Sequence, residues 1–197
     1  KAGGLATESL GSNQMAAEPV TDDVAEAVAV SKEQLQPLVD EAIRRWSLTL
    51  DANLVAAMQR VEVEVTDLAG QALGEYREGV LYIDVNAAGY GWFIDPTPGD
   101  DSEYALLSGA LTATDATTQG QMDLLTVLTH ELGHAVGLEH SDLGVMSESL
   151  EAGIRLLDPV AAVVVNELSA SVQTAAEQPH ASVSAKVNWD KRFAGLV

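Results

Sequence analysis

Three histidines and a glutamate are spaced, within residues 130–140, in the pattern that a zinc-dependent hydrolase needs (His-Glu-Leu-Gly-His-Ala-Val-Gly-Leu-Glu-His). His130 and His134 are four residues apart, so on an α-helix they project from one face, one turn apart. Gly137 allows the chain to leave the helix, because a residue without Cβ can adopt the left-handed conformation. His140 can then approach the same point from a third direction. Three neutral imidazoles and one water form tetrahedral zinc with an open position, which is the catalytic arrangement.

Glu131 is the candidate catalytic residue. It lies about 100° round the helix from His130, where it can hold the zinc-bound water without ligating the metal. There it would act first as general base and then as general acid. The H-E-x-x-H pattern alone has an appreciable false-positive rate, and a site that binds metal without turnover is the alternative. With five fixed positions, a chance match in this composition is on the order of 10⁻⁵.

The elements that must position these residues follow from hydrophobic periodicity. We predict an active-site helix over residues 123–136, with its leucines facing the core opposite the imidazoles. A second helix is predicted from Ser31 to Trp46. Asp142, two residues after His140, is a possible hydrogen-bond partner that orients an imidazole. The other predicted elements are a short helix over 51–59, strands over 61–65 and 80–85, a loop over 86–101, an element of undecided type over 103–111 and a closing helix over 158–169.

Composition limits the class of protein. The 197 residues, 47% hydrophobic, can form one domain of ordinary size, which we expect over 31–170. Residues 1–30 are predicted to be a flexible N-terminal arm and 171–197 a C-terminal tail or linker. No apolar run approaches the length of a membrane span. The net charge of −20 argues against nucleic acid or anionic lipid as partners.

Acidic residues are concentrated around the histidine motif. Between Glu78 and Glu151 there are thirteen Asp and Glu residues and no Lys or Arg. Oxygen ligands suit calcium, so a structural calcium site is predicted, with a solvated acidic loop as the alternative. Cysteine is absent, which excludes disulfides and thiolate ligands. The candidate calcium ligands are Asp84, Asn86, Asp95, Asp100, Asp101 and Glu103.

The histidine motif resembles the signature of the metzincin zinc peptidases, H-E-x-x-H-x-x-G-x-x-H followed by a methionine turn. The matching turn is Gly144-Val145-Met146-Ser147, and the resemblance implies that Met146 lies beneath the imidazoles. Glu148 stands where some metzincins carry a tyrosine ligand, and the motif through Ser141 looks most like the matrixins. The resemblance implies an α+β metzincin (zincin-like) fold with a small twisted mixed sheet, an active-site helix and a C-terminal helix. The cysteine switch of latent matrixins is impossible here.

The resemblance also suggests a setting and a substrate. The segment 83–97 is similar to one in matrixin-like domains of very large bacterial surface or exported proteins, so we expect a secreted or cell-surface multidomain protein. A protein or peptide substrate is implied, paired with an edge strand, for which 90–94 is the candidate. Asp22 and Asp23 are candidates for an aspartate switch, whereas His180 is expected to be irrelevant to the site. The alternatives are a non-catalytic adhesive or structural module, and a self-processing domain cleaved near 1–30 or 170–197.

Overall fold

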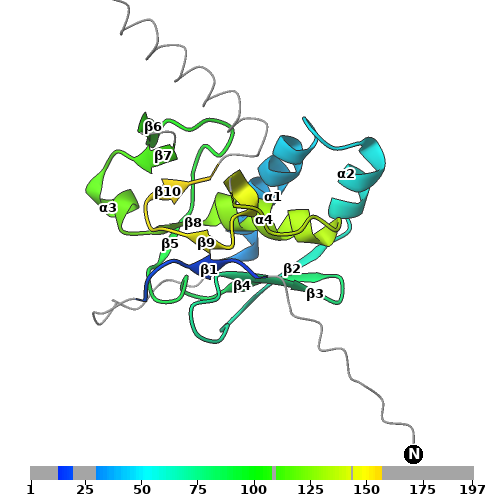
Figure 1. Ribbon diagram of the computed structural model, residues 1–197, viewed down its shortest axis with the longest axis horizontal. Helices are drawn as coiled ribbons and strands as arrows, with labels where there is room; N and C mark the ends of the chain where they lie inside the picture. The colour runs from blue at the N-terminus through cyan, green and yellow to red at the C-terminus, as the bar shows by residue number, and fades with distance from the viewer. Residues whose placement is uncertain (1–12, 20–29, 108–109, 143, 157–197) are drawn as a thin grey trace, which may run out of the picture.

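The computed structural model describes residues 13–19, 30–107, 110–142 and 144–156 (Figure 1). The helices are α1 (Lys32–Trp46), α2 (Ala52–Met58), α3 (Ala116–Gln119), α4 (Leu124–Ala135) and the 3₁₀ turn η1 (Gly144–Met146). The strands are β1 (Met15–Ala16), β2 (Glu62–Thr66), β3 (Gly74–Arg77), β4 (Val80–Asp84), β5 (Trp92–Phe93), β6 (Tyr104–Leu107), β7 (Ala110–Ala113), β8 (Met122–Asp123), β9 (Ser149–Leu150) and β10 (Ile154–Arg155). The predicted α+β class is confirmed.

Helix α1 packs against α4 and sets its position. Ser31 caps α1, with its hydroxyl accepting from the backbone of Gln34 while the Gln34 side chain accepts from the backbone of Ser31. At the other end of α1, the buried indole Nε1–H of Trp46 donates to the carbonyl of Thr129 at 2.8 Å. This bond joins the end of α1 to the middle of α4, one residue before the first histidine of the motif.

The mixed sheet has the strand order β2-β4-β3, with β2 parallel and β3 antiparallel to β4. It lies beneath α1 and α4 in the view of Figure 1. Strand β3 is one edge of this sheet, and Gly74 begins it directly against α4. A Cβ built on Gly74 would lie 2.8 Å from Cγ of Glu131 and 2.8 Å from Cγ1 of Val127. Glycine therefore permits the close approach of the edge strand to the catalytic candidate.

One stretch was left undecided by local patterns. This stretch, 103–111, holds β6 and the start of β7, which pair antiparallel, and β10 pairs with the other edge of β7. The predicted loop 86–101 contains β5, which pairs in parallel with β8. The closing helix predicted over 158–169 falls outside the described residues. In the part that is described, none of the helices has the length and apolar character that a membrane span requires.

Candidate metal and catalytic site

Helix α4 carries the first two histidines and is buried along most of its length. Asp123 caps it, with a carboxylate oxygen accepting from the backbone N–H of Thr126 at 3.1 Å. All side chains from Leu124 to His134 are buried, so the helix cannot shift without disturbing the core. The helix ends as predicted, because Gly137 adopts φ +87° and the chain then turns back toward His140.

The three imidazoles meet at one point. Nε2 of His130 and Nε2 of His134 are 2.9 Å apart, and one nitrogen from each of the three rings lies within 4.8 Å of the others. The ring of His140 is 5.2 Å from that of His130 and 4.8 Å from that of His134, centroid to centroid. In a tetrahedral site with Zn–N bonds of about 2.0–2.1 Å, ligand nitrogens lie about 3.3 Å apart. Within the described ranges this is the one group suited to hold a metal ion.

Backbone carbonyls orient the two buried imidazoles. Nδ1 of His130 lies 2.7 Å from the carbonyl oxygen of Val145, and Nδ1 of His134 lies 2.8 Å from that of Leu138. A carbonyl only accepts, so each Nδ1 is the donor and each Nε2 of the neutral ring keeps its lone pair. Burial, with the neighbouring imidazoles, lowers the pKa of His130 to about 3 and also lowers the pKa of His134. Two neutral ring nitrogens, each with a free lone pair, therefore face each other at 2.9 Å. Two such lone pairs can coordinate a metal cation.

The methionine turn lies under the motif helix. Val145 supplies the carbonyl that holds His130, and the carbonyl of Met146 accepts from the backbone N–H of Ser141 at 2.9 Å. The Met146 side chain is 3% exposed and packs against Gly133, where an added Cβ would lie 2.5 Å from Sδ. The turn therefore supports α4 between its two histidines and fixes one imidazole through the backbone.

Glu131 is fully buried beside the edge strand. Its Oε1 accepts the backbone N–H of Gln14 at 2.9 Å, while Oε2 has no hydrogen-bond partner among the described residues. Burial raises the pKa of Glu131 to about 8, against the lowering effect of backbone N–H donors from Gln14 and Tyr76. Tyr76 belongs to β3, so β3 is the strand beside Glu131. Residues 90–94, the candidate edge for the substrate, contain β5, which pairs with β8 just before α4.

A buried arginine that we did not predict anchors the start of α4. The guanidinium of Arg155, with a fully buried side chain, lies 2.7 Å from Asp95, 2.9 Å from Asp123 and 2.9 Å from Asp101. It also lies over the ring of Tyr104, 4.3 Å from its centroid. The sequence offers one signal for this role, since Arg155 is the first basic residue after the acidic stretch.

The predicted calcium ligands are not gathered into a group that could hold a metal ion in the described part of the chain. Asp95 and Asp101 are ion-paired with Arg155, which supplies the positive charge that a calcium ion would otherwise bring. The remaining four accept protein hydrogen bonds: Asp84 from the backbone of Leu68, Asn86 and Ala88, Asn86 from that of Gly89, Asp100 from that of Ser102, and Glu103 from the hydroxyls of Thr97 and Ser102. The acidic residues that are frequent in this part of the sequence therefore belong to one ion cluster around Arg155 and to several hydrogen-bonded turns.

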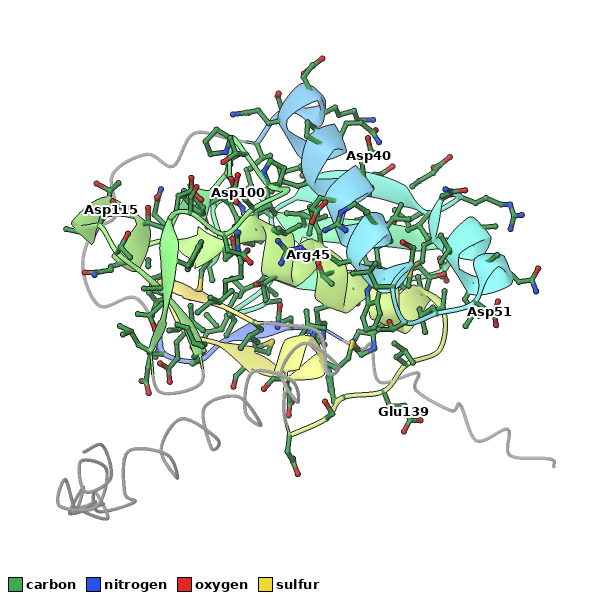
Figure 2. All side chains as sticks on the ribbon, turned by 90° about the horizontal axis from the view of Figure 1, so that it is seen from above. Asp40, Arg45, Asp51, Asp100, Asp115 and Glu139 are labelled. Atoms are coloured by element: carbon green, nitrogen blue, oxygen red, sulfur yellow. The ribbon has the colours of Figure 1, made fainter. Side chains whose placement is uncertain are left out.

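The remaining sequence candidates are Asp142, Asp22, Asp23 and His180. Asp142 is exposed, and carbonyls rather than a carboxylate hold the Nδ1 atoms of His130 and His134. Asp22, Asp23 and His180 lie outside the described residues. Glu139, within the motif, points outward from the loop that follows α4 (Figure 2).

The fold and the site together define a class. A helix with two histidines one turn apart, a third histidine after a glycine turn, and a methionine turn beneath them is the arrangement of the metzincins. The family model described as matrixin matches residues 23–152. The chain belongs to the matrixin family, whose members are in general zinc metalloproteases acting on protein substrates. No curated protein and no solved structure matches the chain.

Proposed function

We propose that this protein is a zinc-dependent endopeptidase in which His130, His134 and His140 hold the metal and Glu131 is the general base and acid. Bound zinc would supply a water of lowered pKa and polarise the scissile carbonyl. Glu131 would hold that water, take its proton during attack and deliver the proton to the leaving nitrogen. The observation that carries the proposal is the convergence of the three imidazoles beside a buried carboxylate, one oxygen of which has no hydrogen-bond partner in the described part of the chain.

The Glu131→Gln variant tests the mechanism. Glutamine keeps the shape of the side chain but cannot take a proton, so cleavage of external peptides should fall at least about 10²-fold. Zinc content by elemental analysis and the thermal unfolding midpoint should stay close to those of the original protein. Glu139→Gln is the matched control, because this exposed motif residue points away from the site, and its activity should not change.

Assays of peptide cleavage also distinguish a catalytic domain from a non-catalytic structural module. A zinc-loaded chain that cleaves no member of a diverse peptide library would favour the non-catalytic alternative. Unchanged cleavage by Glu131→Gln would refute the assigned role of that residue. A chelator added to the original protein should abolish cleavage, and readdition of zinc should restore it.

We also propose that the domain acts outside the cell as part of a larger bacterial protein. The support is the similarity of residues 83–97 to segments of exported matrixin-like domains, and the absence of cysteine is compatible with it. Fractionation of cells that express the natural gene tests this proposal. Recovery of the protein in the cytosolic fraction alone would contradict it.

A further inference from the structure

The segment 13–17, predicted as part of a flexible arm, forms a strand between two parts of the domain. On one side, the backbone N–H of Leu73 donates to the Gln14 carbonyl at 2.9 Å and that of Ala16 donates to Gln71 at 2.8 Å. On the other side, the N–H of Met15 donates to Glu148 at 2.9 Å and that of Ala17 to Leu150 at 2.9 Å. The extended segment is thus hydrogen-bonded along both edges.

The pairing has a definite direction. β1 runs parallel to β9, with Met15 opposite Ser149, and antiparallel to the chain at Ala72, just before the edge strand β3. β1 and β9 lie close together in Figure 1. A peptide that adds as a strand obtains affinity from main-chain bonds of this kind and specificity from alternate side chains. Segment 13–17 is held in the manner of a bound peptide.

Gln14 brings this strand to the catalytic candidate. Its backbone N–H donates to Oε1 of Glu131 at 2.9 Å, and this nitrogen is the amide nitrogen of the Asn13–Gln14 bond. A general acid must be within hydrogen-bond reach of the nitrogen that it protonates. The side chain of Gln14 is fully buried, and its Nε2 donates to the carbonyl of Ser147, the last residue of the methionine turn, at 3.2 Å. Gln14 is therefore held in a buried position next to Glu131.

We propose that residues 13–17 are a substrate of this domain's own site and that the Asn13–Gln14 bond is cleaved within the same molecule. This inference rests on the proposed function. Water adds across the bond: the Asn13 carbonyl carbon gains the hydroxyl, the C–N bond breaks and Gln14 becomes an amino terminus. Glu131 accepts the water proton and passes it to the nitrogen of Gln14, the atom to which it is already hydrogen-bonded.

The 197-residue chain, loaded with zinc, is incubated and followed by intact mass and amino-terminal sequencing, with an external peptide library assayed in parallel. We expect a fragment that begins at Gln14, or at its cyclised pyroglutamate form. The fraction cleaved per unit time should not change over about a hundredfold dilution. Glu131→Gln should give none of this fragment. A rate that rises with concentration would overturn the intramolecular step.

Two lysine substitutions compare a buried position of the segment with an exposed position just after it. Gln14→Lys puts a charge at a fully buried position, so self-cleavage should slow at least about tenfold. Glu18→Lys introduces a lysine at an exposed position and should cleave at the original rate. Equal rates for the two variants would overturn the assignment of Gln14.

A measurement on Glu131→Gln tests the placement of the strand without turnover. Hydrogen exchange at the backbone N–H groups of Met15 and Ala16 should be at least about 10²-fold slower than in an unstructured chain, because both are hydrogen-bonded. Unprotected amides there would overturn the inference. If external peptides are cleaved while Asn13–Gln14 stays intact, the inference fails and the proposed function stands. If neither is cleaved, both fail.

Discussion

Arg155→Met should destabilise the fold more than any exposed charge substitution. The variant would leave the carboxylates of Asp95 and Asp123, both with fully buried side chains, without the guanidinium that lies within 3 Å of each. Removing one partner of a buried ion pair costs about 3–5 kcal/mol. A domain of this size has a total unfolding free energy of about 5–15 kcal/mol, so the loss is a large fraction of it.

Urea unfolding followed by tryptophan fluorescence measures the effect. With an m-value of about 1–3 kcal/mol/M, a loss of 3–5 kcal/mol lowers the midpoint by about 2 M. Arg77→Met is the matched control, because the half-exposed Arg77 pairs with Glu75 at 3.2 Å and such pairs contribute at most about 1 kcal/mol. If Arg155→Met shifts the midpoint no more than Arg77→Met does, the buried cluster does not stabilise the fold as argued.

Two further substitutions test contacts of α4. Gly74→Ala places a Cβ 2.8 Å from Cγ of Glu131, so kcat for peptide cleavage should fall at least about tenfold by displacement of the carboxylate. Gly99→Ala is the control, because Gly99 has open space around it, and its kcat should not change. Equal kcat values for the two variants would contradict the argument. Trp46→Phe removes the indole donor to the buried Thr129 carbonyl and should cost about 1–2 kcal/mol in thermal unfolding, whereas an unchanged midpoint would show that this bond contributes no stability.

Local patterns carried the prediction of the main elements. The capping box at Ser31 and the apolar stripe up to Trp46 mark the bounds of α1, and alternation over 61–65 predicts a strand within a residue of β2. Helix α4 follows the prediction as well, with Asp123 as its cap. These signals are local, because capping bonds and side-chain periodicity depend on residues within a few positions of each other.

Assignments that depend on distant partners were missed. The carboxylates of Asp95 and Asp101 suggested calcium in the sequence, whereas their partner is Arg155, more than fifty residues away. The sequence also did not place β3 beside Glu131, a contact that Gly74 permits. No local pattern distinguishes an acidic residue that faces a buried cation from one that faces water.

By itself, the sequence determined the chemistry of the motif: two histidines one helical turn apart, a glutamate beside them and a glycine where the helix ends. Their spacing along one helix is set by helical geometry, which is local. Only the tertiary structure decided what surrounds them. The carbonyl of Val145 orients His130, and residues 13–17 reach Glu131 from more than a hundred positions away, because main-chain pairing between distant segments depends on the folded arrangement and leaves no mark in residue type.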